Sequence, residues 1–388
     1  MAASLSPATP ITSHLARVFS QYPLEVVHAE GVWLHTRDGR KILDYYGGHA
    51  VAALGYGHPR WIAALEQQAR EVLFQTNAIP MAVRERAASR LVAFAGLGLD
   101  DVFFVNSGAE ANENALRLAF RQTGRRTAVA LEQGWHGRTA AAGAVTHGAR
   151  EKWYGFPQAP FDVRWISRTD PDAAAAGIDD DTACVIVEPV QGLAGAFEVP
   201  VAVLEAIRRR CTEVGALLIF DEVQCGVGRT GWAFGANRVG VTPDILTTAK
   251  ALGAGFPVSA MLLSKAVSAR LKLEDMGTTF GGGPLACAVV EAVIDIIESE
   301  DLLGNVRRMS ALIHEQCIVG PVTGIQGAGL LLGLRTSRPA KQVQQELMAR
   351  GIFAGTAADP NIVRLLPPFT LQAEHVAALA AALQELPA

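Results

Sequence analysis

The stretch GALLIFDEVQCGVGRTG, residues Gly215 to Gly231, joins an apolar run to a loop of polar residues and glycines. The run ALLIF lacks polar alternation, which is typical of a strand covered on both faces of a sheet. Gly226, Gly228 and Gly231 have the spacing of a dinucleotide-binding turn. In such a turn the first glycine follows the strand directly and the third lies in a helix. Here DEVQC intervenes, and the following WAFGANRVGVTPD is a poor helix, so the sequence argues against a dinucleotide site.

Similar apolar runs recur along the chain and alternate with helical patterns. Each of them suits a strand that helices cover on both sides, as in a mostly parallel sheet. The sequence therefore predicts an α/β fold. The predicted strands are Val102–Val105, Thr127–Glu132, Cys184–Glu188, Ala216–Phe220 and Ile245–Ala249.

The pattern changes on either side of this central region. Before it, GVWLHTRDGRKILDYYGG predicts a hairpin that turns at Asp38–Gly39. After it, a long helix begins near Pro284 and a last amphipathic helix lies near Ala373–Leu386. A chain of 388 residues has room for two domains. We expect an N-terminal arm and hairpin over residues 1–49, a large domain over 50–283 and a smaller α+β domain over 284–388.

Composition indicates a small-molecule protein. The formal net charge is −4 and no basic block stands out, so we expect neither a nucleic-acid nor a membrane partner. No apolar run approaches the roughly 20 residues that span a bilayer. The five cysteines lack the spacing of a disulfide framework or a metal site, which favours no metal and a cytoplasmic location. We interpret residues 1–23 as an arm rather than a transit peptide.

Polar residues follow each predicted strand at the point where it ends. The carboxyl ends of parallel strands meet at one crevice, where ligands collect. We therefore expect these polar groups to form one site. In chain order they are NSGAEAN, QGWHGRT, PVQG, DEVQ and Lys250.

Three of these groups together favour pyridoxal phosphate. Ser107 and Glu110 form a capping box, so a helix begins at the crevice with free amides that suit a phosphate. Lys250 ends an apolar strand, and a desolvated amine suits a Schiff base with an aldehyde. Asp221 supplies a carboxylate for a protonated ring nitrogen. The alternatives are a box that only caps its helix and a structural ion pair between the lysine and the aspartate.

At this point the sequence resembles a known family, the class III pyridoxal-phosphate aminotransferases of fold type I, and within them the acetylornithine and ornithine aminotransferases. The likeness runs through nearly the whole chain, with its motifs in family order. They are LDYYGGHAVAALGYGHP, FFVNSGAEAN, WHGRT, VIVEPVQG, LLIFDEVQCGVGRTG, PDILTTAKALGAGFP, TTFGGGPLACA and RLLPPF.

The resemblance implies a role for each matching residue at the cofactor. Lys250 would bind the cofactor covalently and Asp221 would pair with the ring nitrogen. Thr279 would reach the phosphate of a neighbouring subunit, so the resemblance implies a homodimer with shared sites. The phosphate would be held by Ser107, Gly108 and Ala109, and the ring and its phenolic oxygen would be contacted by Trp135, Glu188, Val223 and Gln224.

The implied substrate residues include departures from the family pattern. Arg138 is a fork-shaped donor suited to a substrate carboxylate. In the family, a glutamate after EPxQG pairs with the arginine that is Arg364 here, and this sequence has Leu193 instead. His49 stands where ornithine enzymes have a tyrosine, and Gly283 replaces an asparagine. We expect Arg364 to remain open to carboxylates unless another acid pairs with it.

The expected reaction is amino transfer between N-acetylornithine, or a related acyl-amino or ω-amino acid, and 2-oxoglutarate. The amine of Lys250 would act as general base and acid in a ping-pong mechanism that proceeds through Schiff bases. Three alternatives stay open at this stage. They are a transaminase with a different donor scope, an aminomutase, and a nicotinamide dehydrogenase.

Overall fold

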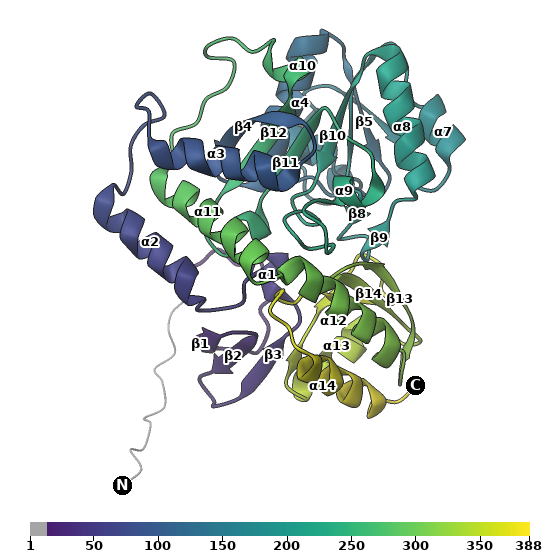
Figure 1. Ribbon diagram of the computed structural model, residues 1–388. Helices are drawn as coiled ribbons and strands as arrows, with labels where there is room; N and C mark the ends of the chain where they lie inside the picture. The colour runs from purple at the N-terminus through teal and green to yellow at the C-terminus, as the bar shows by residue number, and fades with distance from the viewer. Residues whose placement is uncertain (1–13) are drawn as a thin grey trace.

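The computed structural model describes residues 14–388 and shows two packed lobes (Figure 1). Part of the expected N-terminal arm, residues 1–13, lies outside the described residues. The larger lobe is built on a seven-stranded sheet in the order β4-β12-β11-β10-β7-β5-β6. These strands are β4 Leu99–Val105, β5 Thr127–Leu131, β6 Asp162–Ile166, β7 Thr182–Val187, β10 Leu217–Asp221, β11 Ile245–Thr248 and β12 Ser259–Ser264.

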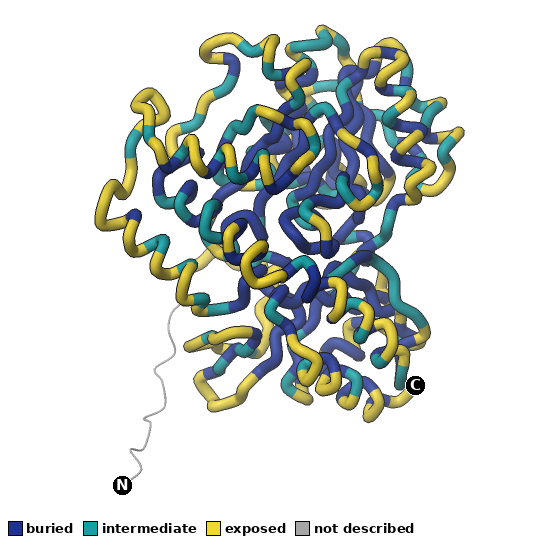
Figure 2. Tube along the Cα trace, in the orientation of Figure 1, coloured by how far each residue is buried: buried dark blue, intermediate teal, exposed yellow. Residues whose placement is uncertain are grey.

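All the strands of this sheet except β12 run in the same direction. β12 is antiparallel to both of its neighbours, β11 and β4. Each predicted strand is present, and every residue of β5 and of β7 is buried, as the unbroken apolar runs indicate (Figure 2). The prediction of a mostly parallel α/β sheet is therefore confirmed, while β6 and β12 were not anticipated from the sequence.

Helices cover this sheet on both sides. α4 crosses it over β7, β10, β11 and β12, and α8 packs on β7 and β10. The helices of this part of the chain are α2 Pro59–Glu71, α3 Ala82–Ala95, α4 Gly108–Thr123, α5 Ala140–Ala144, α6 Ala149–Lys152, α7 Pro171–Ala176, α8 Val201–Val214, α9 Gly235–Val239, α10 Lys265–Ser268 and α11 Pro284–Ser299. α11 packs against α2 and α3, although it falls in the segment 284–388 that we assign to the smaller domain. That domain boundary remains a prediction.

The smaller lobe combines both ends of the chain (Figure 1). The predicted hairpin is present as β2 Trp33–Thr36 and β3 Lys41–Asp44, with β1 Val26–Glu30 beside it. β15, Ile352–Phe353, pairs with β3 in parallel and so joins the C-terminal segment to the N-terminal strands. The other elements are β13 Val322–Ala328, β14 Leu331–Thr336, β16 Gly355–Thr356, β17 Ile362–Leu365, α12 Leu302–Gln316, α13 Ala340–Ala349 and α14 Ala373–Gln384.

A left-handed turn lies where the hairpin leads into the larger lobe. Each residue of this turn, Gly47–Ala50 (α1 in Figure 1), has a positive φ, including His49 at 67°. Non-glycine residues rarely adopt this conformation, and such strain concentrates at functional sites. A small β-ribbon, β8 Val190–Gln191 with β9 Phe197–Glu198, follows β7.

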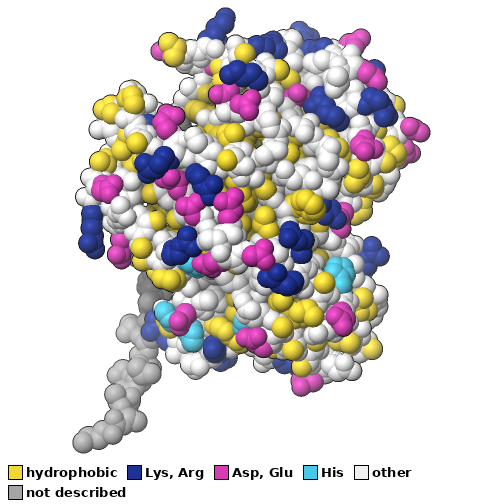
Figure 3. All heavy atoms as spheres, viewed as in Figure 1, with side chains coloured by type: hydrophobic (Ala, Val, Ile, Leu, Met, Phe, Trp, Pro, Cys, Tyr) yellow, Lys and Arg dark blue, Asp and Glu magenta, His cyan; other side chains and the backbone are white. Residues whose placement is uncertain are grey.

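The surface fits a small-molecule protein. On the face in Figure 3, acidic and basic side chains are interspersed and no block of one sign stands out. Within residues 14–388, no helix has the length and apolar character needed to cross a membrane.

Candidate active site

A cavity of about 810 Å³ lies beyond the carboxyl ends of the parallel strands. It brings together residues from the ends of β4, β5, β7, β10 and β11, as the strand-end argument predicts. Thr279 is exposed and does not line this cavity. The predicted residues that do line it are His49, Ser107, Gly108, Ala109, Trp135, Arg138, Glu188, Leu193, Asp221, Val223, Gln224, Lys250 and Arg364.

Lys250 follows β11 and has a left-handed backbone, with a φ of 48°. Its pKa is lowered, because burial disfavours the charged amine. The carboxylates of Asp221 and Glu188 partly oppose this shift. The site therefore shifts the amine toward the neutral form that a nucleophile or a general base requires.

The Asp221 carboxylate is held by a buried hydrogen-bond chain. Its Oδ2 lies 2.7 Å from Nδ2 of Asn112, which donates, and 2.8 Å from Nδ1 of His136. The hydroxyl of Thr247, which pairs with Asp221 across the sheet, donates to Oδ1 of Asn112 at 2.6 Å. Asp221 Oδ1 accepts from the backbone amide of Val223 at 3.1 Å. The carboxylate is thereby fixed in one orientation toward the cavity.

The start of α4 forms the second part of the site. Ser107 Oγ accepts from the amide of Glu110 at 3.2 Å, as the capping box predicts. The reciprocal bond differs from the prediction, because the Glu110 carboxylate binds the backbone and side-chain nitrogens of Asn106 instead of the Ser107 amide. In the first turn of a helix the amides, here those of Gly108 and Ala109, have no helical acceptor. They are available to an anion.

Two glycines permit close contacts with Val223 and Gln224, which the resemblance places against the cofactor ring and its phenolic oxygen. A Cβ at Gly108 would lie 2.6 Å from Cγ1 of Val223, so the start of α4 packs directly on that side chain. A Cβ at Gly192 would lie 1.6 Å from Oε1 of Gln224. That oxygen is buried and has no hydrogen-bond partner in the described chain, which leaves an acceptor available to a ligand.

Glu188 lies beside Lys250 and Asp221 at the base of the cavity. Its carboxylate accepts from the amide of Trp135 at 2.7 Å and from that of Gly192 at 3.3 Å. Its pKa is raised to about 7, chiefly by burial; the charge of His136 lowers it and that of Asp221 raises it. Burial therefore favours the protonated form of this carboxyl.

Arg364 is buried without an acid. It is 3% exposed, and its Nε donates to the carbonyl of Thr356 at 2.7 Å. Nη1 donates to the carbonyl of Gly192 at 3.3 Å, beside Leu193, and Nη2 lies 3.5 Å from the hydroxyl of Tyr46. Within residues 14–388 no carboxylate lies in ion-pair range of it, so another acid does not replace the glutamate that the resemblance leads us to expect at position 193.

His49 and Arg138 complete the polar lining of the cavity. The pKa of His49 is lowered by desolvation and by the charges of Arg364 and Lys250, which favours a neutral ring at pH 7. Arg138 is exposed and packs on the rings of Trp135 and Trp153. The cavity therefore contains two guanidinium groups that carboxylates can reach.

These residues fit pyridoxal phosphate. The helix start offers amides to a phosphate, Asp221 offers a fixed carboxylate to a ring nitrogen, and Lys250 offers a partly neutralised amine to an aldehyde. Gln224 has an unpaired buried acceptor close to the same position. This agreement comes from independent parts of the chain.

Several contributors were missed in the sequence. Asn112 and His136 hold Asp221, and the sequence predicts no role for either residue, although both lie within motifs of the family. Asn112 is a buried polar residue on the apolar side of α4, one turn after Gly108, and that position is a signal for it. Trp153 gave no such signal, because it reaches Arg138 only through the fold.

The loop GVGRTG has a structural role. No helix begins at its third glycine, which confirms that it is not a dinucleotide turn. Arg229 is fully buried and donates to the carbonyls of Leu330, Pro367 and Ala50. Its guanidinium also packs on Phe369, 4.5 Å from the ring centroid. The loop therefore joins the larger lobe to segments of the smaller one.

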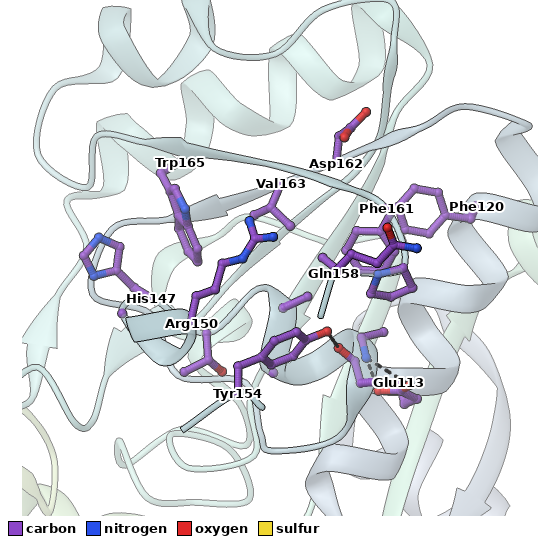
Figure 4. A pocket seen from close by; sticks show the side chains of 18 of the residues that line it. Glu113, Phe120, His147, Arg150, Tyr154, Gln158, Phe161, Asp162, Val163 and Trp165 are labelled. Atoms are coloured by element: carbon purple, nitrogen blue, oxygen red, sulfur yellow. Dashed lines mark hydrogen bonds between the residues drawn. The ribbon is translucent and has the colours of Figure 1, made fainter. Parts of the chain in front are cut away.

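A larger cavity of about 1450 Å³ lies between α4, the segment of α5 and α6, and β6 (Figure 4). None of the predicted site residues lines it. The two cavities have no lining residue in common, although α5, which lines the larger one, begins two positions after Arg138 of the first.

Comparisons with known proteins agree with this site. The sequence profile of the family "Aminotransferase class-III" matches residues 15–386. Acetylornithine aminotransferase of Mesorhizobium japonicum is 40% identical, with 92% of each chain covered. The same-named protein of Streptomyces coelicolor is 41% identical over 93% of this chain and 90% of its own.

A solved structure agrees with the fold. The ornithine aminotransferase of Toxoplasma gondii, which holds pyridoxal phosphate at partial occupancy in its active site, superposes with a TM-score of 0.89 at 26% identity. The match covers 96% of this chain and 91% of that one. The predicted cofactor, pyridoxal phosphate, and the predicted reaction type, amino transfer, are thereby confirmed, and neither an aminomutase nor a dehydrogenase is favoured. The chain belongs to the class-III aminotransferase family.

Proposed function

We propose that the protein transfers an amino group from N-acetylornithine, or a related acyl-amino or ω-amino acid, to 2-oxoglutarate. The observation that carries this proposal is the pair of guanidinium groups, Arg138 and Arg364, that line the same cavity as Lys250 and pair with no carboxylate of the described part of the chain. Amino acids and 2-oxo acids have carboxylates that such groups bind. The names of the relatives support acetylornithine in particular.

For the cofactor we assign roles to residues whose positions suit them. The amides after Ser107 would hold the phosphate, Trp135 and Val223 would enclose the ring, and Gln224 would meet its phenolic oxygen. Asp221 would pair with the ring nitrogen, supported by Asn112 and His136. Bound pyridoxal phosphate supplies an aldehyde for the amino group and a cationic ring that stabilises negative charge on the donor carbon.

Lys250 would move the proton. Its Nζ is buried and its pKa is lowered, so at neutral pH it could take a proton from the donor carbon and return it to the cofactor carbon. Glu188 lies beside it with a pKa of about 7 and holds the amides of Trp135 and Gly192 in place.

Leu193 would keep Arg364 available to carboxylates. Its side chain lines the cavity, and its neighbour Gly192 accepts a hydrogen bond from Arg364. A leucine cannot compete for the guanidinium, so glutamate and 2-oxoglutarate would bind without first displacing a protein carboxylate.

We also propose a homodimer in a cytoplasmic location. Exposed apolar side chains gather near Thr279, among them Leu73, Phe74, Ile79 and Phe280, with the rings of Phe74 and Phe280 5.2 Å apart. Such a cluster favours burial against a second copy. Sedimentation of the holoenzyme at micromolar concentration would contradict the dimer if it gave a monomer. The five cysteines are free thiols, which supports a reducing compartment.

The test of the proposed reaction separates its two halves. Holoenzyme mixed with N-acetylornithine alone should convert fully to the pyridoxamine form, and 2-oxoglutarate alone should return it. The spectrum of the cofactor reports each step. A holoenzyme that neither N-acetylornithine nor any other acyl-amino or ω-amino acid converts would contradict the donor, and failure of 2-oxoglutarate to restore it would contradict the acceptor.

A further inference from the structure

The guanidinium of Arg138 packs on two indole rings. Its Cζ lies 4.4 Å from the ring centroid of Trp153 and 5.3 Å from that of Trp135. The two rings are 5.5 Å apart and tilted by 51°. Contacts at these distances are cation–π contacts, which arginine forms more often than lysine.

These contacts matter because Arg138 forms no ion pair or side-chain hydrogen bond with another residue among 14–388. It is exposed, and no ion pair joins it to a carboxylate of the described chain. A free arginine on a surface samples many rotamers, and a ligand must order it at an entropic cost. Aromatic packing acts on the flat face of the guanidinium and leaves the N–H groups at its edge free for a carboxylate.

Trp153 is itself held firmly in place. It ends α6, where its amide donates to the carbonyl of Ala149 at 2.9 Å. Gly143 of α5 lets the segment approach, because a Cβ there would lie 3.0 Å from the Tyr154 ring and 3.5 Å from Trp153. Tyr154 then donates its hydroxyl to the carbonyl of Ala140 at 2.5 Å.

The backbone next to Arg138 is fixed at the same point. Glu113 of α4 accepts from the hydroxyl of Thr139 and from the amides of Ala141 and Ala142, which begin α5 (Figure 4). Figure 4 shows Tyr154 directed toward this same end of α5. Arg138 and Trp153 are therefore both anchored to one short scaffold, although they are 15 positions apart in the sequence.

We propose that Trp153 is a positioning residue that orients Arg138 for the carboxylate of the substrate. It contacts the arginine and does not line the cavity that contains Lys250. The proposal rests on the proposed function, in which Arg138 binds a carboxylate. Trp153 would then be a specificity determinant that contacts Arg138 from outside the cavity and belongs to none of the family motifs in the sequence.

The test uses glutarate, an unreactive dicarboxylate with the carbon chain of 2-oxoglutarate, titrated into the holoenzyme by calorimetry. Trp153→Leu should weaken glutarate about fivefold, the upper end of what an exposed cation–π contact contributes. Trp153→Phe should restore at least half of that loss, because a ring remains. Phe156→Leu is the matched control: it removes an exposed ring from the same segment that contacts Tyr154 and not Arg138, and it should leave binding unchanged.

A double-mutant cycle shows whether Trp153 acts through the arginine. In an Arg138→Gln background, Trp153→Leu should cause no further loss, and in the wild-type background it should raise the KM for 2-oxoglutarate while kcat stays within twofold. Unchanged glutarate affinity in Trp153→Leu, or an equal loss in both backgrounds, would overturn the proposal. Unchanged affinity in Arg138→Gln itself would instead remove the carboxylate role of Arg138 from the proposed function, and the role of Trp153 with it.

Discussion

Replacing Leu193 by glutamate should close the carboxylate site at Arg364. Leu193 lines the cavity, and the carbonyl of the preceding Gly192 lies 3.3 Å from Nη1 of Arg364. The backbone there is fixed, because the Leu193 carbonyl accepts from the amide of Ala358 at 2.9 Å. A carboxylate at this position can therefore reach a buried guanidinium whose present partners are neutral oxygens.

The size of the effect follows from the hydrogen bond between the introduced carboxylate and Arg364, which a substrate carboxylate would have to displace. Hydrogen bonds to charged groups contribute about 1.5–3 kcal/mol, so a substrate carboxylate should bind Arg364 roughly 10- to 100-fold more weakly in Leu193→Glu. Leu193→Gln has nearly the same shape without the charge and should lose less than threefold. The difference between the two variants isolates the ion pair.

The assay compares the two half-reactions by the spectrum of the cofactor. In Leu193→Glu, kcat/KM for glutamate should fall at least tenfold, while that for N-acetylornithine, whose carboxylate Arg138 can bind instead, should change less than threefold. Equal losses for the two donors, or equal behaviour of the glutamate and glutamine variants, would refute the reasoning about Arg364.

Further predictions concern the groups around the cofactor. Asn112→Ala removes the 2.7 Å bond to Asp221 and should lower kcat roughly 10- to 100-fold; it should also lower the melting temperature, because the Thr247 hydroxyl and the His136 carbonyl lose a buried partner. Burial raises the pKa of Glu222 to about 7, so the folded state binds a proton that the unfolded state has lost, and unfolding free energy should fall by roughly 1–3 kcal/mol between about pH 5 and pH 8. Urea unfolding of Glu222→Gln should show a smaller fall, because the Glu188 carboxyl, whose pKa is also raised to about 7, still contributes in this pH range. Gly108→Ala should weaken pyridoxal phosphate about tenfold in a fluorescence titration, because its Cβ meets Val223 at 2.6 Å, and Val223→Ala should restore binding.

The sequence predicted the parts of the fold that local pattern determines. Unbroken apolar runs marked the buried strands, and polar residues at their ends marked the site, because both follow from burial on two faces of a parallel sheet. β12 was missed. It follows Lys250 after a glycine-rich turn, and its reversal of direction depends on pairing with β4, more than 150 positions earlier.

The finer geometry of the site depended on tertiary contacts that no local pattern contains. One of the two hydrogen bonds of the predicted capping box is present, from the Glu110 amide to Ser107. The Glu110 carboxylate accepts from Asn106 instead of the Ser107 amide. Arg364 was identified, yet the way in which its burial is satisfied was not, because its acceptors are carbonyls from Thr356 and Gly192 in separate segments. A sequence shows which side chains can accept a bond, but every backbone carbonyl is an equal candidate until the fold is known.

Covalent attachment of the cofactor to Lys250 is the claim on which the account depends most directly. Holoenzyme reduced with borohydride, digested and measured by mass spectrometry should carry the mass of reduced pyridoxal phosphate on the peptide that contains Lys250. Lys250→Ala should lack this label and should lose turnover. A label on another lysine, or a Lys250→Ala variant that keeps wild-type turnover, would contradict the account.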